Sequence, residues 1–326
     1  MKVSIRDRLD AVGARAWDDL VAASRLRSPF LSWTWQCEWS RTFAEQRRLE
    51  IRCVEDDGGD LVALLPLYES APGAMETIGG ADVSDYLDLI AVKGREEEAW
   101  TALLQSRTAD AVEWVLHAVP EASPTVSALS PLASACGLAA SAAVEERCPV
   151  LALPPSWEAY LARLSGKHRH ELQRKMRRLE REAPDAHASC VATPADIEAR
   201  LGDFLALHRS SRVGKARFMD DRMERFFRRA LTAFAEQGAA RLWFLDTSWG
   251  PIAAFVTIEW DGTVGLYNSG FAPERAALSP GVVLLARVIR DAIERRCAKF
   301  DFLRGEERYK YEFEPIPEAV YQVRIR

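Results

Sequence analysis

Short hydrophobic runs alternate with stretches of helical periodicity along the first half of the chain. Apolar runs bounded by turn residues predict strands, and the sequence Asp56-Asp57-Gly58-Gly59 between the first two predicts a hairpin. One segment with apolar positions at helical spacing predicts a helix. The predicted strands are 49–54, 61–68, 86–92, 112–117 and 149–153, and the predicted helix is 96–105.

The pattern restarts after Pro154-Pro155, a dipeptide typical of linkers. Ser156 is suited to cap a helix that begins at Trp157, and Asp261-Gly262 is a strong signal for a two-residue hairpin turn. Helices then alternate with a hairpin and further strands, and the first half shows a weaker version of this order. We therefore predict an α/β (α+β) fold with two domains, 1–153 and 154–326. Besides the helix that begins at Trp157, the predicted helices of the second domain are 167–182, 197–208, 221–236 and 282–296, and its predicted strands are 240–246, 252–260, 263–269 and 299–303.

Composition excludes several classes of protein. The 326 residues carry a formal charge of −5, which argues against general binding to nucleic acid or to anionic membranes. No apolar stretch approaches the roughly 20 residues of a membrane span, and the charged N-terminus lacks a signal core. The 6 cysteines form no Cys-x-x-Cys pair and are expected to be reduced thiols. We expect a soluble, cytoplasmic protein, a monomer or homodimer, without a metal.

The clearest candidate for ligand binding is the start of the predicted helix 282–296. Ser279 fits the position that caps a helix, and Pro280 suits the first turn. Gly281 allows a ligand to approach the backbone closely. Unpaired N–H groups and the helix dipole would make this start an anion site for a phosphate or pyrophosphate. A plain capping motif is the alternative.

The helix 167–182 is strongly basic, with apolar positions at Leu172, Met176 and Leu179. Its charged residues form either a solvated face or a docking surface for phosphate-bearing material, such as an acyl-donor nucleotide, a lipid- or nucleotide-linked sugar, or tRNA. The cations are Lys167, Arg169, Arg174, Lys175, Arg177, Arg178 and Arg181.

Several segments, in this order, resemble the GNAT acyltransferase superfamily. In the second half they are Tyr267-Asn268-Ser269-Gly270, Leu278-Ser279-Pro280-Gly281 and Asp301-Phe302-Leu303-Arg304-Gly305-Glu306-Glu307-Arg308-Tyr309-Lys310. Ala81-Asp82-Val83-Ser84-Asp85-Tyr86-Leu87-Asp88-Leu89 and Leu164-Ser165-Gly166-Lys167-His168-Arg169 extend the likeness over most of the chain. They are most similar to the tandem-domain branch of cellulose-biosynthesis-type (CelD- and BcsL-like) acetyltransferases, which is related to FemABX-like peptidyltransferases.

This resemblance implies two GNAT-like domains, each a mixed, mostly antiparallel sheet flanked by helices, with acetyl-CoA or another acyl-CoA held by the second. The pantetheine arm would follow the strand 263–269, and the pyrophosphate would bind at residues 279–282. The implied donor-binding residues are Ser269, Phe271, Ser279, Gly281 and Val282. The chain departs from the superfamily pattern Q/R-x-x-G-x-G/A, because Leu278 and Pro280 stand at its glycine positions when Arg275 is taken as the first residue.

Transfer to an amine requires a base and a proton donor for the leaving thiolate. A buried carboxylate can serve as the base. We prefer Asp85 over Asp88, since in an extended segment the two point to opposite faces; carboxylates that only bond backbone are the alternative. Tyr309 lies where GNAT enzymes often carry the acid, and Tyr267 and Tyr311 are further candidates. The residues expected to bind the acceptor are Tyr86, Asp88, Lys167, Arg169, Arg304 and Lys310, and the cations among them could equally be surface residues.

The resulting hypothesis is an N-acyltransferase that moves an acyl group from a CoA or carrier-protein thioester to a small-molecule amine. On the family branch alone, the acceptor is an amino sugar or another cell-envelope or exopolysaccharide precursor. Two alternatives stay open. One is a peptidyltransferase that depends on aminoacyl-tRNA, and the other is a catalytically silent GNAT-like binding module.

Overall fold

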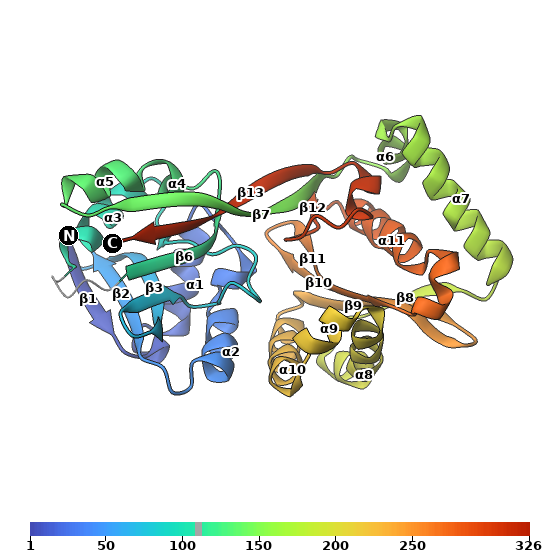
Figure 1. Cartoon of the computed structure of the whole chain (residues 1–326), viewed down its shortest axis with the longest axis horizontal. Helices are drawn as coiled ribbons and strands as arrows, with labels where there is room; N and C mark the ends of the chain where they lie inside the picture. Colours follow the sequence, from blue (N-terminus) through green and yellow to red (C-terminus); the bar gives the residue numbers. More distant parts are fainter. Residues whose placement is uncertain (108–112) are drawn as a thin grey trace. The chain divides into compact units, whose positions relative to one another are not determined.

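A computed structural model describes residues 1–107 and 113–326, apart from the side chain of Val213. The chain forms two compact units (Figure 1), Met1–Arg147 with Glu318–Arg326, and Cys148–Pro317. The first boundary lies close to the predicted division at 153 and 154. The chain end differs from the prediction: strand β13 (Ile316–Ile325) pairs with β6 (Glu113–Pro120), so the last nine residues belong to the first unit.

The first unit is built on a mixed sheet. Its strand order is β1-β2-β3-β4-β6-β13-β7, and β5 pairs with β3 off this path. The strands not yet defined are β1 (Lys2–Arg6), β2 (Leu49–Glu55), β3 (Leu61–Ala71), β4 (Ala74–Thr77), β5 (Ile90–Ala91) and β7 (Ala140–Ala152). The helices are α1 (Ala14–Ala23), α2 (Trp33–Phe43), α3 (Glu96–Gln105), α4 (Pro124–Ser127) and α5 (Leu129–Ala135).

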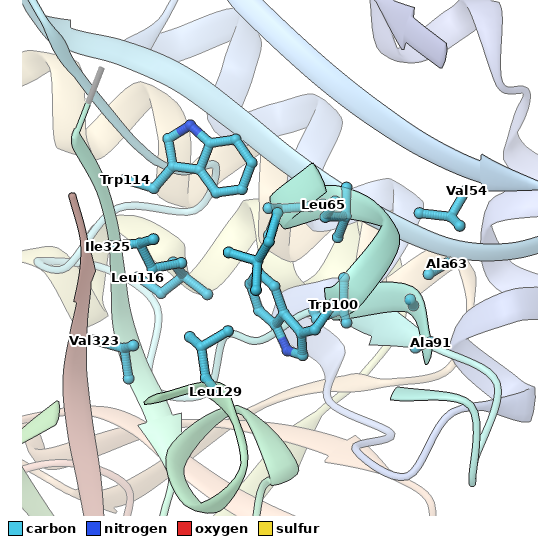
Figure 2. Packing of buried hydrophobic residues seen from close by; sticks show 14 of the residues in the cluster. Val54, Ala63, Leu65, Ala91, Trp100, Trp114, Leu116, Leu129, Val323 and Ile325 are labelled. Carbon is cyan, nitrogen blue, oxygen red and sulfur yellow. The ribbon is translucent and has the colours of Figure 1, made fainter. Parts of the chain in front are cut away.

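One hydrophobic cluster of this unit contains two buried tryptophans, Trp100 of α3 and Trp114 of β6 (Figure 2). Aliphatic side chains from the sheet and from α5 surround them, among them Leu65 and Leu129. The indole N–H of Trp100 donates to Thr125 Oγ1 at 2.9 Å, so that the one polar atom of this buried ring is satisfied.

The second unit has its own sheet, in the order β7-β12-β11-β10-β9-β8, where β7 contributes its last residues. Figure 1 shows α8, α9 and α10 on one face and α6, α7 and α11 on the other. The strands are β8 (His187–Val191), β9 (Ala240–Thr247), β10 (Gly250–Trp260), β11 (Thr263–Phe271) and β12 (Lys299–Asp301). The helices are α6 (Trp157–Arg163), α7 (Gly166–Glu182), α8 (Pro194–Ser211), α9 (Val213–Phe218), α10 (Asp221–Glu236) and α11 (Pro280–Glu294), with short 3₁₀ turns η3 (Pro273–Leu278) and η4 (Lys310–Phe313).

Several predicted elements agree closely with the structure. Helices α3 and α10 have the predicted bounds, and the Ser156 hydroxyl caps α6 by accepting from the Ala159 N–H at 3.1 Å. The predicted hairpin turn is also present. Asp261 and Gly262 have φ angles of 47° and 73°, the left-handed values that suit a two-residue hairpin.

The strand predicted at 86–92 is wrong except for β5, which spans Ile90–Ala91. The preceding residues form a buried loop, and their backbone hydrogen bonds do not follow the pairing pattern of a strand. The Ser28 hydroxyl donates to the Tyr86 carbonyl at 3.1 Å, and the Leu87 N–H donates to the Ala118 carbonyl at 3.1 Å.

Other predicted bounds need smaller corrections. The strand predicted at 299–303 ends at Asp301, and Leu303 takes a left-handed φ of 54°. The helix predicted at 282–296 runs from Pro280 to Glu294 and is followed by a left-handed Arg296. Val112, the first residue of a predicted strand, lies outside the described residues.

Two general properties concern the described ranges. None of their helices is both long and apolar enough to cross a membrane. Their six cysteines are free thiols, of which Cys37, Cys53 and Cys148 are buried. Burial raises the pKa of the Cys37 thiol to about 12.

Candidate functional site

A cavity of about 290 Å³ lies in the second unit, where two neighbouring strands separate. Strands β11 and β12 pair in parallel from Thr263 to Gly265; β12 then ends, while β11 continues to Phe271. The cavity lies between the end of β11, the segment that follows β12, and the start of α11. Its lining residues are Ser211, Arg212, Lys215, Phe255, Ser269, Gly270, Phe271, Ala276, Ser279, Pro280, Gly281, Val282, Glu307 and Tyr309.

One wall of the cavity is fixed by a close contact between β11 and the C-terminal end of α8. A Cβ atom on Gly270 would lie 2.5 Å from the His208 nitrogen, so this approach requires glycine. The Ser211 hydroxyl adds a second link, because it accepts from the Phe271 N–H at 2.9 Å. Together these contacts hold the end of β11 against α8.

The start of helix α11 forms another part of the cavity lining. Ser279 stands at the predicted capping position, but its backbone is left-handed (φ 51°, ψ 46°), and in the described chain its side chain accepts no bond from the first turn. The side-chain cap predicted for Ser279 is therefore wrong. Val283 donates its N–H to the Ser279 carbonyl at 3.1 Å, whereas a helix offers the preceding N–H groups of Gly281 and Val282 no internal partner.

The helix start is consequently suited to an anion. Its partial positive charge faces the cavity at Ser279–Val282, without a capping oxygen from Ser279 to compete for the N–H groups. A Cβ added to Gly281 would meet nothing within 4 Å, so the space beside this residue is open. The sequence-predicted donor residues Ser269, Phe271 and Val282 also line the cavity.

Three polar side chains form a hydrogen-bonded group in the cavity wall. Lys215 Nζ donates to Ser269 Oγ at 3.0 Å and to the Ser269 carbonyl oxygen. Ser269 is in turn hydrogen-bonded to the Tyr309 hydroxyl. Burial and the nearby carboxylate of Glu307 raise the pKa of Tyr309, so its phenol stays protonated at neutral pH.

Lys310 was expected to bind substrate, but it is engaged in the turn that follows β12. Its ammonium is buried and donates to the Arg304 and Gly305 carbonyls at 2.8 and 3.0 Å. It also lies 2.9 Å from the Glu307 carboxylate. Burial favours a raised pKa for Glu307, but the pairing with Lys310 outweighs it and lowers that pKa. These contacts account for Lys310 as a structural cation.

The predicted residues of the first unit do not belong to the described cavity lining. Asp85 and Asp88 are buried, and Tyr86 lies half-buried between them. The Asp88 carboxylate accepts from the Thr125 hydroxyl at 2.6 Å, the Leu89 N–H at 2.8 Å and the Ser123 hydroxyl. Burial raises the pKa of Asp88 to about 6 despite these bonds. Asp88 thus anchors the loop to the start of α4.

The other predicted residues lie outside that lining as well, as far as the chain is described. Tyr267 stacks on Phe227 of α10, with ring centroids 5.3 Å apart. Arg304 is half-buried in the turn before Gly305, and Lys167 and Arg169 are exposed on α7.

Four of the seven cations of the basic helix α7 pair with carboxylates, most of which belong to the same helix. Lys175 pairs with Glu312 at 2.5 Å, and Arg174 with Glu171 at 2.7 Å. Leu172 and Leu179 are buried where α7 packs against α11. These contacts favour the interpretation of α7 as a solvated face.

Sequence reasoning did not single out five of the lining residues, which are Ser211, Arg212, Lys215, Phe255 and Ala276. Arg212 and Lys215 are three residues apart at the start of α9, a spacing shared by many surface cations. Their role becomes visible only when α9 is placed beside β11. In the described chain, no group of three or more His, Cys, Asp or Glu side chains is placed to hold a metal ion.

The mixed sheet flanked by helices, with a parallel pair that separates at the cavity, is a GNAT-type fold. Solved structures with this fold align over nearly the whole chain. FemX matches with a TM-score of 0.65 at 10% identity, covering 99% of this chain and 97% of that one. A tandem GNAT protein from the clavulanic acid biosynthesis pathway matches with a TM-score of 0.51 at 15% identity, covering 99% of this chain and 97% of that one. L-PGS from Bacillus licheniformis matches with a TM-score of 0.55 at 10% identity, covering 95% of this chain and 90% of that one.

The second unit can be assigned further. Residues 166–311 match the family model of the acetyltransferase (GNAT) domain, and this range includes every residue that lines the cavity. The matched range lies wholly within the second unit. At the identities above, the structural likeness shows the fold alone. No curated protein matches the sequence.

Proposed function

We propose that the protein is an N-acyltransferase that transfers an acyl group from an acyl-CoA thioester to an amine. The observation that carries this proposal is the composition of one cavity, which combines the uncapped start of α11 with a protonated tyrosine. The first feature suits the diphosphate of CoA, and the second suits a leaving thiolate.

The donor would bind by its diphosphate and its arm. The N–H groups of Gly281 and Val282 would donate to phosphate oxygens, and the helix dipole would add to the attraction. The arm would follow β11 past Phe271 and Ser269, where pairing with β12 has ended. A cavity of about 290 Å³ lies near the lower end of ligand sites, which matches an arm that bears a thioester.

Tyr309 would donate its proton to the thiolate as the carbon–sulfur bond breaks. Its raised pKa makes it an acid rather than a base at neutral pH. Asp85 remains the predicted base for the acceptor amine, and Tyr86, Lys167, Arg169 and Arg304 remain predicted acceptor residues. An amino sugar or other envelope precursor as acceptor rests on the sequence segments alone.

The direct test is thermal stability in the presence of acetyl-CoA, longer acyl-CoAs and total tRNA. A donor at about 100 times its Kd should stabilise the native protein by about 2–3 kcal/mol. No stabilisation by any CoA would contradict the proposal. Salt-sensitive binding of aminoacyl-tRNA would then favour the peptidyltransferase, and failure of both would favour a silent binding module.

A further inference from the structure

Lys215 reaches the cavity from α9 and contacts the same serine as the proposed acid. We propose that Lys215 and Ser269 form a proton relay that resupplies Tyr309 after it has protonated the leaving thiolate. This inference rests on the proposed function, since it gives Tyr309 a partner in that reaction. Lys215 acts through Ser269 and is therefore a positioning residue, whereas Tyr309 is the catalytic acid.

The contacts define a continuous path from Lys215 to Tyr309. Lys215 Nζ lies 3.0 Å from Ser269 Oγ, and it also donates to the Ser269 carbonyl. The second bond holds the ammonium at the backbone of β11 even when the Ser269 hydroxyl rotates or exchanges its proton. The Ser269 hydroxyl bonds to Tyr309, so one oxygen joins the two titratable side chains. All three residues line the cavity, where a thiolate would form.

The surroundings adjust Lys215 to this task. Burial, together with the positive charges of Arg212 and Lys310, lowers its pKa to about 8, against an opposing effect of Glu307. Burial and the nearby Lys215 charge lower the pKa of His208 to about 4, so this histidine is neutral at working pH and does not compete for the proton. Lys215 is thus charged at neutral pH and still able to give up a proton.

The proposed reaction is a direct acyl transfer followed by reprotonation of Tyr309. The neutral amine attacks the thioester carbonyl carbon, the carbon–sulfur bond breaks, and the sulfur takes the Tyr309 proton. Ser269 passes its hydroxyl proton to the phenolate and takes one from the Lys215 ammonium. The new amide nitrogen releases its extra proton to solvent, and Lys215 regains one from solvent. The net reaction is thioester plus amine to amide plus thiol.

This relay predicts a particular pH dependence. Lys215 must be protonated to resupply Tyr309, so turnover should fall as the pH rises through about 8. A lysine that only anchors β11 would give no such limb. Hydroxylamine is a suitable acceptor for this measurement, because it is a weak base that is already uncharged at neutral pH and adds no limb of its own above neutral pH.

The experiment measures CoA release from acetyl-CoA and hydroxylamine in the full chain, from neutral pH to about pH 10, a range that reaches close to the unperturbed lysine pKa. Lys215→Met should lower kcat about 10- to 100-fold and abolish the limb near pH 8. Lys215→Arg should lower kcat at neutral pH less than Lys215→Met does. It should also move the alkaline limb to higher pH, since arginine stays protonated. Ser269→Ala cuts the relay but keeps the carbonyl that holds Lys215. Ser210→Ala is its control, because that hydroxyl bonds the Leu207 carbonyl and lies outside the described cavity lining.

A readout without turnover separates the relay from the proposed function. In lysine-labelled protein, NMR should show one lysine titrating near pH 8, absent in Lys215→Met and shifted in Ser269→Ala. The relay alone would be overturned if the variants still bind acetyl-CoA and one of two results is seen. Either Lys215→Met keeps the alkaline limb of the pH profile, or Ser269→Ala leaves the lysine signal unshifted. Failure of the wild-type chain to bind acetyl-CoA or to release CoA would overturn the proposed function and the relay with it.

Discussion

Gly270 of β11 lies so close to α8 that a Cβ atom there would come within 2.5 Å of the backbone nitrogen of His208. Backbone atoms cannot move aside as a flexible side chain can. We therefore predict that Gly270→Ala lowers the free energy of unfolding by at least about 2 kcal/mol and distorts the cavity wall. Urea denaturation measures this loss.

Gly281 provides the matched control. A Cβ there would meet nothing within 4 Å, and the residue is in the first turn of α11. Gly281→Ala should leave stability unchanged or raise it by up to about 1 kcal/mol. Equal losses in both variants would show that the close contact between β11 and α8 is not what makes Gly270 necessary.

Tyr309→Phe tests the proposed acid. We expect kcat to fall about 100-fold or more while the Kd for acetyl-CoA changes little, because the hydroxyl acts on the leaving group. The control is Tyr311→Phe, which removes a hydroxyl that donates to Glu306 Oε1 at 3.2 Å outside the described cavity lining. Steady-state kinetics and calorimetry separate the two effects. Similar rates for both variants would remove Tyr309 from the mechanism.

Lys310→Met distinguishes a structural cation from one that binds substrate. Removal of the buried ammonium leaves three carbonyls and the Glu307 carboxylate without their partner, which should cost about 3–5 kcal/mol of stability. Lys167→Met, at an exposed position of α7, should change stability by less than about 0.5 kcal/mol. A folded, equally stable Lys310→Met variant that has lost only acceptor affinity would restore the sequence-based expectation.

Asp88 should make stability depend on pH. Its pKa in the folded chain is about 6, above the ordinary value of 3.8, so the folded state holds the proton more tightly between these values. The stabilisation that comes from this protonated carboxyl is fully present below about pH 4 and is lost as the pH rises through 6. The stability of the wild type relative to Asp88→Asn should fall by up to about 3 kcal/mol over this range.

Denaturation at a series of pH values measures this difference. Asp60→Asn, in the exposed turn after β2, is the control and should differ from the wild type by less than about 0.5 kcal/mol throughout. If the free energies of unfolding of the wild type and Asp88→Asn differ by the same amount at every pH, the folded state does not raise the pKa of this carboxyl.

Much of the fold could be predicted because local signals agree with the tertiary structure. The bounds of α3 and α10 follow from apolar periodicity, and Asp261-Gly262 forms its turn through left-handed backbone angles. The strand predicted at 86–92 failed for a different reason. Its apolar residues are buried as expected, but hydrogen bonds from distant residues such as Ser28 hold them in a loop. Such bonds leave no periodic signal in the sequence.

The candidate site shows the same division. Ser279 to Val282 could be found because proline and glycine mark a helix start, although the left-handed Ser279 was not expected. Lys215 could not be found, since its position depends on the packing of α9 beside β11. Lys310 was found by its motif, but its partners are carbonyls of a turn that follows β12. Motifs located the segments, and packing decided what their side chains contact.

The most direct test of the anion site is the affinity of Gly281→Asp for acetyl-CoA, measured by calorimetry together with thermal stability. A carboxylate in the first turn of α11 should stabilise the free helix by about 0.3–1 kcal/mol and repel a diphosphate, so stability and binding move in opposite directions. Gly166→Asp places the same charge in the first turn of α7, where a Cβ also meets nothing within 4 Å. We predict at least a tenfold weaker affinity for acetyl-CoA in Gly281→Asp and wild-type affinity in Gly166→Asp. Wild-type affinity in a stable Gly281→Asp protein would contradict the proposed anion site.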